Sequence, residues 1–338
     1  MLVQSAEITM AEKMEIVHSE KLGTNSAPIM GGFNWQFLVQ GDSWFSTSTL
    51  KPWSRSNLLE QMEFPQRAIA INCADPGDTL AHMVEWRRDP LFFACLAGPR
   101  QMPWSAIFLS AGGNDLIDAV QVPAVGDDQV PMAPHERLLL TSTEWGGVLA
   151  SNDNKYISAQ GWENFANHLV LQFKALDFIR STSTDNKNTP IFTHTYDYAT
   201  PRASGAGLKL GPWLLPALKT YQIPEDDWNA LADAFIDKLA AVVMNLNLPN
   251  FHVVDTRRTL TRADRSATGE SNDWENEIHP TADGYRKLAP LLVSRVCKVL
   301  NIPAATLQPA LAAATDALPA AASVAAMRQT PAAGSAHH

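Results

Sequence analysis

The stretch FLVQGDSWF, residues 37–45, joins a short hydrophobic run to a turn that carries a serine. Such runs, which end at small or polar residues, are typical of buried parallel strands whose carboxyl ends carry chemistry. Four similar runs follow along the chain: AIAI before Asn72, AIFLS before Ala111, IFTHT before Tyr196 and HVVD before Thr256. The sequence therefore predicts five parallel strands.

Helical patterns lie between these hydrophobic runs. The clearest cover residues 228–246 and 281–300. The second of them has one apolar face, made by Tyr285, Leu288, Leu292, Val296 and Val299. Strands that alternate with helices predict an α/β fold with a doubly wound parallel sheet and right-handed crossovers. Ligands of such sheets bind beyond the carboxyl ends of the strands.

The chain has 338 residues, of which 46% are hydrophobic, so it can bury one large core. We expect an N-terminal extension over residues 1–30, one main domain over 31–302, and a flexible tail rich in Ala and Pro over 303–338. Two connections, 116–155 and 199–226, are longer than a strand-to-helix loop requires. We interpret both as insertions that shape a substrate site.

The composition argues against several classes of protein. A formal net charge of −9 without a basic stripe disfavours nucleic-acid binding. The three cysteines, Cys73, Cys95 and Cys297, are widely spaced, which predicts free thiols rather than disulfides or a metal site. Histidine pairs at ligand spacing are absent, so we predict no metal and no other cofactor. The sequence does not determine the oligomeric state.

The N-terminus breaks every short apolar run with a charge, unlike a secretory signal. No later stretch has the apolar length of a membrane span. We therefore expect a cytoplasmic protein without an integral membrane segment, although non-classical export stays open.

Three turns at the predicted strand ends carry residues suited to acyl chemistry. Ser43 stands at a strand-to-helix turn, which exposes its hydroxyl and its N–H above the sheet. In NCADPGDT, residues 72–79, Gly77 can present a bare N–H to an oxyanion. In GGND, residues 112–115, Asn114 can donate its side-chain N–H. Each turn alone is typical of an ordinary loop, but three in this order after three consecutive strands favour catalysis.

A candidate general base lies near the C-terminus. His279 belongs to DWENEIHPT, residues 273–281, where it precedes a proline and a helix start. It is therefore expected on a rigid loop that follows the fifth strand and can reach the earlier strand ends. From there its imidazole can take the proton of a serine.

These four blocks resemble the SGNH (GDSL-type) hydrolase superfamily, which is named after its Ser, Gly, Asn and His. The matching residues are Ser43, Gly77, Asn114 and His279, and the resemblance spans residues 38–298. It implies a three-layer α/β/α sandwich with a five-stranded, flavodoxin-like parallel sheet. It also implies a serine esterase in which Ser43 attacks the acyl carbon and His279 removes its proton. The N–H groups of Ser43 and Gly77 and the side chain of Asn114 then hold the oxyanion.

The sequence departs from the superfamily at the third member of the triad. Members commonly have Asp three residues before the His, and here that position is Asn276. Asn276 can orient the ring through its amide oxygen, and Asp273 can do so if the segment between them folds as a turn. We rank these two about equal and place Glu277 third, and a backbone carbonyl stays open as the sole partner of the ring.

Aromatic residues near the strand ends are candidates for the substrate pocket. Trp44, Phe45, Trp145 and Trp213 are suited to an apolar acyl site, while Tyr196 either contacts substrate or anchors the following insertion. The sequence thus predicts a carboxylic-ester hydrolase, lipase-like in its chemistry, that acts on a small-molecule ester. Acyl transfer or thioester hydrolysis at the same site, or a catalytically silent binding module with this fold, are the alternatives.

Overall fold

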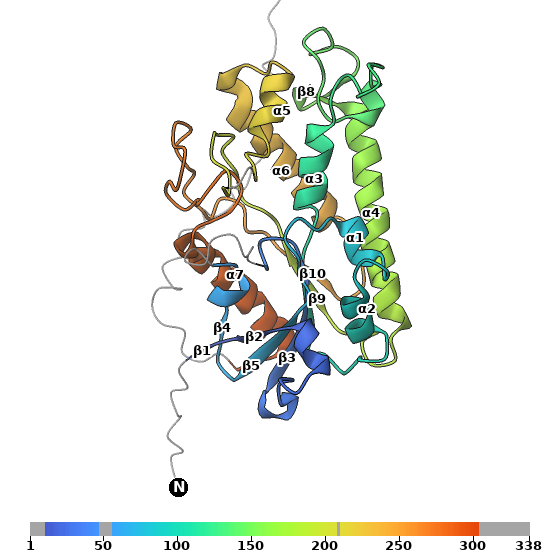
Figure 1. Cartoon of the computed structure of the whole chain (residues 1–338), viewed down its shortest axis with the longest axis vertical. Helices are drawn as coiled ribbons and strands as arrows, with labels where there is room; N and C mark the ends of the chain where they lie inside the picture. The colour runs from blue at the N-terminus through green and yellow to red at the C-terminus, as the bar shows by residue number, and fades with distance from the viewer. Residues whose placement is uncertain (1–10, 47–55, 208–209, 304–338) are drawn as a thin grey trace, which may run out of the picture. The chain divides into compact units, whose positions relative to one another are not determined.

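A six-stranded parallel sheet is the centre of the computed structural model, which describes residues 11–46, 56–207 and 210–303 (Figure 1). In spatial order, the strands are β10 (Phe251–Val254), β9 (Ile191–His194), β6 (Ala106–Ser110), β3 (Trp35–Gly41), β5 (Ala68–Asn72) and β2 (Glu15–His18). The predicted α/β fold class and all five predicted strands are confirmed. The predicted flexible tail lies, from residue 304 onward, outside the described residues.

The sixth strand is the one that the sequence did not predict. β2 pairs in parallel with β5 at the edge of the sheet, and its residues come from the segment expected as an N-terminal extension. Only Val17 of this strand is buried, whereas Glu15 and His18 are exposed. A short, half-exposed edge strand gives a weak hydrophobic pattern, which explains the omission.

Helices cover both faces of the sheet, which makes a three-layer arrangement (Figure 1). α7 packs against β9 and β10, and α1 and α2 pack against β3 on the other side, where α4 contacts α1, α2 and α6. The helices are α1 (Leu80–Val84), α2 (Pro90–Leu96), α3 (Gly113–Gln121), α4 (Ala159–Thr182), α5 (Leu215–Thr220), α6 (Trp228–Met244) and α7 (Ala282–Leu300). With both faces covered, β5 and β6 are buried at every position, as parallel sheets require.

The two helices predicted most clearly, α6 and α7, are confirmed. α7 begins after Thr281, whose hydroxyl accepts a hydrogen bond from the N–H of Gly284 at 3.0 Å. Of its predicted apolar face, Tyr285, Leu288, Leu292 and Val296 are buried and Val299 is partly buried. This packing fixes the helix that follows the candidate base.

The two long connections differ in structure. The first contains most of α3, the short helix η4 (Pro134–Glu136), β7 (Ala150–Ser151) and the start of β8 (Asn154–Ser158), with which β7 forms a hairpin. The second contains α5 and the short helix η5 (Glu225–Asp227). Near the N-terminus, β1 (Glu12–Lys13) pairs with β4 (Glu63–Phe64), and η1 (Ser19–Gly23), η2 (Met30–Gly32) and η3 (Leu59–Gln61) complete the elements.

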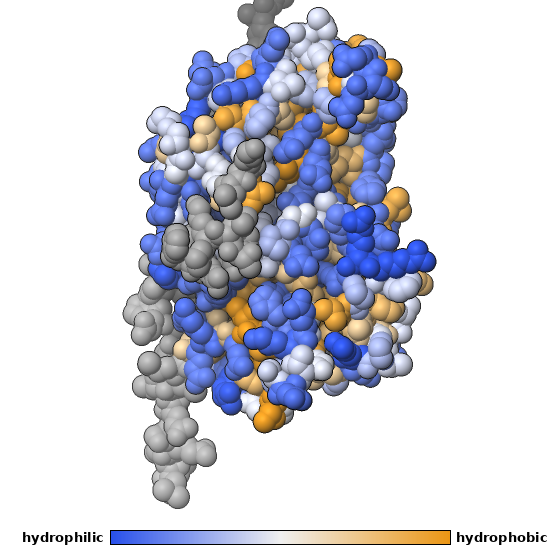
Figure 2. All heavy atoms as spheres, in the orientation of Figure 1, coloured by the Kyte–Doolittle hydropathy of each residue, from blue (hydrophilic) through white to orange (hydrophobic). Residues whose placement is uncertain are grey.

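One face of the molecule is mostly hydrophilic (Figure 2), and the cysteines are not paired in disulfides. Figure 2 shows hydrophilic residues over most of one face, with hydrophobic residues in small groups among them. The three cysteines are free, as predicted, and Cys73 and Cys95 are buried. No helix of the described segments is long and apolar enough to cross a membrane.

Candidate active site

The order of the strands creates a crevice where β3 and β6 lie side by side. From β3 the chain continues to β5 on one side, and from β6 it continues to β9 on the other. At such a switch point the loops at the carboxyl ends diverge and leave space for a ligand. Ser43 follows β3 directly, and Asn114 is in the first turn of α3 after β6. The fold therefore brings both predicted residues to the crevice.

The turn that carries Ser43 is held from below by Asp42. Its carboxylate accepts the N–H of Trp44 at 3.0 Å, and its backbone carbonyl accepts the N–H groups of Phe45 and Ser46, each at 3.0 Å. Gly41 leads into this turn without room for a side chain, since a Cβ there would lie 2.9 Å from the Cβ of Ser110. Close contact between β3 and β6 thus fixes where the serine emerges.

Ser43 and His279 form a direct hydrogen bond. The Ser43 Oγ lies 2.7 Å from the Nε2 of His279, and the Nδ1 of the ring lies 3.0 Å from the Oδ1 of Asn276. That Oδ1 also accepts the backbone N–H groups of Ile278 at 3.1 Å and His279 at 2.9 Å. Because only an oxygen can accept them, the amide orientation is fixed, and Nδ1 must carry the ring proton. Nε2 is then free to accept the serine proton.

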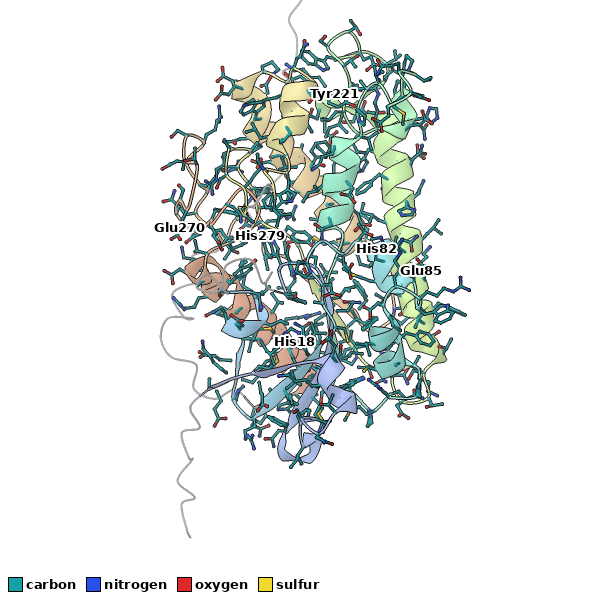
Figure 3. All side chains as sticks on the ribbon, viewed as in Figure 1. His18, His82, Glu85, Tyr221, Glu270 and His279 are labelled. Carbon is teal, nitrogen blue, oxygen red and sulfur yellow. The ribbon has the colours of Figure 1, made fainter. Side chains whose placement is uncertain are left out.

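The environment keeps this imidazole neutral. Burial lowers the pKa of His279 from 6.5 to about 4. Asn276 carries no charge that would stabilise the imidazolium and raise the pKa again. The ring of Trp213 lies edge-on to the imidazole, with centroids 5.2 Å apart. At neutral pH the histidine is therefore in the form that can act as a base. Figure 3 labels it on the loop before α7, above the strands.

The two carboxylates considered as partners of the ring have other contacts. Asp273 binds the Nζ of Lys287, at 2.7 and 2.6 Å, and accepts the N–H of Thr261 at 2.6 Å. Its side chain thus holds the base loop against α7. Between the two residues that the sequence left about equal, Asn276 is the one that contacts the imidazole.

Glu277 joins the base loop to the second insertion. Its buried carboxylate accepts the backbone N–H groups of Leu214 at 2.8 Å and Leu215 at 2.9 Å, and also that of Trp213. It also accepts the N–H of Arg202 at 3.2 Å, and the Arg202 guanidinium donates to the carbonyl of Asn276 at 2.7 Å. The insertion over 199–226 is therefore bound to the loop that carries the base, and Glu277 is not a partner of the ring.

Two of the three predicted oxyanion residues, Gly77 and Asn114, lie on linked turns. The Nδ2 of Asn114 donates to the backbone carbonyl of Asp78 at 2.9 Å, which ties α3 to the turn that contains Gly77. Gly77 has a φ of 88°, a conformation that favours glycine, and nothing lies within 4 Å of where its Cβ would be. Asn114 and Ser43 line the same hollow, whereas Gly77 does not line it.

The predicted aromatic residues divide into two groups. Trp44 and Tyr196 line the hollow beside Ser43, and Trp213 contacts His279. Phe45 is fully buried against His194, and Trp145 packs on Tyr156 in the first insertion. The expectation for Phe45 and Trp145 is therefore corrected, because both belong to the packing of the fold and not to the hollow.

A buried polar cluster beneath Ser43 was not predicted. Asp42 accepts the hydroxyl of Tyr196 and that of Ser110, the latter at 2.7 Å. The Ser110 Oγ also lies 3.1 Å from the Nε2 of His194, whose Nδ1 faces the carbonyl of Thr195 at 2.8 Å. Its members end three different strands, so the only signal in the sequence was their position at strand ends.

No protein-family model matches the sequence, and no curated protein matches it either. Among solved structures, an extracellular lipase from Streptomyces rimosus is similar at 14% identity and a TM-score of 0.42, over 77% of this chain and 99% of that chain. A chain described as a GDSL-like lipase from Parabacteroides merdae is similar at 12% identity and a TM-score of 0.39, over 80% and 97%. Phospholipase A1 from Streptomyces albidoflavus is similar at 13% identity and a TM-score of 0.39, over 77% and 98%. At these values we base the functional conclusion on this chain's own residues.

Proposed function

We propose that the chain is a serine hydrolase of carboxylic esters, of the SGNH type that its motifs resemble. The observation that carries the proposal is the 2.7 Å contact between Ser43 Oγ and His279 Nε2, with the proton of the ring fixed on the other nitrogen. Ser43 is partly exposed and lines a hollow, so an ester can reach it. A hydroxyl that faces an unprotonated imidazole and a ligand site is the arrangement of an activated nucleophile.

In the proposed first half-reaction, the Ser43 Oγ attacks the acyl carbon and its proton moves to His279 Nε2. The carbonyl oxygen becomes an oxyanion that accepts the N–H groups of Ser43 and Gly77 and one N–H of the Asn114 amide. Asn114 has two such hydrogens, and the bond to Asp78 uses one of them. The tetrahedral intermediate then breaks its bond to the leaving oxygen, which takes the proton from Nε2.

In the second half-reaction, water attacks the acyl-enzyme on Ser43 while His279 Nε2 takes one of its protons. The intermediate releases the carboxylic acid, and the proton returns to the Ser43 Oγ. Asn276 keeps Nδ1 as the donor throughout, which an aspartate would also do. An amide has no charge to pair with the imidazolium, so its stabilisation of that ion is smaller.

The test is hydrolysis of p-nitrophenyl butyrate together with labelling by a fluorophosphonate. We expect Ser43→Ala to abolish both, while Ser181→Ala, at an exposed serine of α4, leaves both unchanged. Hydrolysis that survives in Ser43→Ala would place the nucleophile elsewhere. A wild-type protein that neither labels nor hydrolyses any ester would instead support the silent binding module.

A further inference from the structure

An apolar hollow extends from Ser43 into the protein. The space between its walls and across its mouth is about 570 Å³, open solvent included, of which about 50 Å³ can be reached by the centre of a water molecule, and Ser43 and Asn114 lie on its wall. Hydrophobic side chains of two helices form much of the rest: Leu116 and Ile117 of α3, and Ala232, Phe235 and Ile236 of α6. The hollow therefore offers hydrocarbon surface directly beside the proposed nucleophile.

Apart from Ser43, Asn114 and the indole N–H of Trp274, which has no partner, the polar side chains on its wall are hydrogen-bonded to the protein. Asp197 accepts the backbone N–H groups of Arg258, Thr259 and Leu260, each at 2.8 Å. The hydroxyl of Tyr196 donates to Asp42. A polar occupant would lose its bonds to water and find few partners in exchange, whereas a hydrocarbon chain has no such bonds to lose. The walls thus favour an aliphatic occupant.

The position of His279 indicates which half of an ester enters. The leaving oxygen must face His279, because this residue protonates it in the proposed reaction. Of the two members of that pair, Ser43 lines the hollow and His279 does not. With the leaving oxygen at the base and the oxyanion at Asn114, the remaining substituent of the acyl carbon, its chain, is the part that can enter the hollow.

We propose that the hollow between α3 and α6 binds the aliphatic chain of the acyl group, so that the substrates are esters of fatty acids several carbons long. This inference rests on the proposed esterase function and adds its substrate class. Burying one methylene contributes about 0.8 kcal/mol, which corresponds to about a fourfold gain in kcat/KM. We expect this gain for each added carbon until the hollow is full.

The test is the chain-length profile of p-nitrophenyl esters, from acetate to laurate, in the wild type and three variants. Ala232→Leu adds bulk to the wall, and Ile236→Ala removes it. Ala241→Leu is the matched control, because it makes the same substitution as Ala232→Leu at an exposed position of α6. Thermal melting by circular dichroism checks that each variant is folded.

We expect the optimum to move to shorter chains in Ala232→Leu and to longer chains in Ile236→Ala, with Ala241→Leu like the wild type. Hydrolysis of the acetate ester and fluorophosphonate labelling should stay within about twofold of the wild type in Ala241→Leu. A flat profile in an active wild type, or an optimum that stays in place in both folded wall variants, overturns the inference alone. Loss of labelling and hydrolysis in the wild type refutes the esterase itself.

Discussion

The described part of the chain contains two serine–histidine contacts that are alike in their immediate geometry. Ser43 lies 2.7 Å from the Nε2 of His279, and Ser110 lies 3.1 Å from the Nε2 of His194. In each histidine, Nδ1 faces an uncharged carbonyl oxygen, that of the Asn276 side chain or of the backbone. Burial lowers both pKa values to about 4. Distance and ring environment alone do not distinguish them.

Access and competition for the proton do distinguish them. Ser110 is fully buried, whereas Ser43 is partly exposed in the hollow. The single hydrogen of the Ser110 hydroxyl also has a second acceptor, since Asp42 Oδ1 lies 2.7 Å away. A serine beside a neutral histidine is therefore a candidate nucleophile only where an ester can reach it and no carboxylate competes for its proton.

The buried contact also favours the binding of a proton by Asp42. With Asp42 ionised, the Ser110 hydroxyl donates its one hydrogen to Asp42 Oδ1, so the neighbouring Nε2 of His194 receives none from Ser110. Once Asp42 is protonated, the direction of this bond can reverse: Asp42 donates to Ser110, and the Ser110 hydroxyl is then free to donate to His194. Burial, which raises the pKa of Asp42 to about 6, acts in the same direction.

The largest effect, on kcat, is expected from His279→Gln, and His194→Gln provides the comparison. His279→Gln removes the proposed base and should lower kcat by about 10⁴-fold. His194→Gln leaves the base in place and disturbs the buried cluster and its packing on Trp44 and Phe45, so kcat should change by less than tenfold, with a stability loss of about 1–3 kcal/mol. Steady-state kinetics and urea unfolding measure both. Equal losses of kcat in two folded variants would show that the contacts do not differ in function.

The next effect is on the pH dependence of the free energy of unfolding, through the proton that Asp42 binds. Because its pKa is raised from 3.8 to about 6 by burial, the folded state binds this proton more tightly than the unfolded state. This contribution to stability is present below pH 4 and is lost as the pH rises through 6. A shift of this size corresponds to about 3 kcal/mol.

Asp42→Asn removes this titration, since an amide does not ionise. The decrease in the free energy of unfolding between pH 4 and 7 should therefore be smaller in Asp42→Asn than in the wild type, by up to about 3 kcal/mol. Urea unfolding across this pH range gives the comparison. Asp118→Asn, at an exposed aspartate of α3, is the matched control and should follow the wild type. Parallel curves for Asp42→Asn and the wild type would contradict a proton held in the cluster.

The smallest effect is on the pH–rate profile, through the contact between His279 and Asn276. Asn276→Asp places a charge beside Nδ1 without changing the tautomer, so the pKa of His279 should rise from about 4 by one to three units. The acidic limb of the kcat/KM profile should move to higher pH by the same amount. A pH–rate profile of both proteins measures the shift. An unmoved limb would mean that His279 is not the group whose ionisation limits the reaction.

The sequence predicted the residues that end single strands better than the contacts between strands. Ser43 could be predicted because it follows a hydrophobic run that marks a strand. His279 could be predicted because it precedes a proline and the start of a helix. Asn276 and Asp273 could not be ranked, since both positions are compatible with a turn. The contact of Asn276 with the imidazole and the ion pair of Asp273 with Lys287 separate them. The cluster of Asp42, Ser110 and His194 depends on strand order, which local patterns do not contain.

Packing direction explains the remaining errors. Phe45 lies two residues after Ser43, but the turn directs it into the core against His194. β2 was missed because one buried side chain in a strand of four residues is too little for a hydrophobic pattern. Both errors concern which way a side chain points, and that is set by the neighbouring elements.

Glu277 couples the position of the second insertion to that of the base loop. Its carboxylate holds the segment that carries Trp213, and the next residue but one in the chain is His279. A change in the length of the segment between Arg202 and Trp213 would therefore displace His279, the proposed base. In directed evolution, the leaving-group side of this protein should tolerate substitutions far better than insertions or deletions.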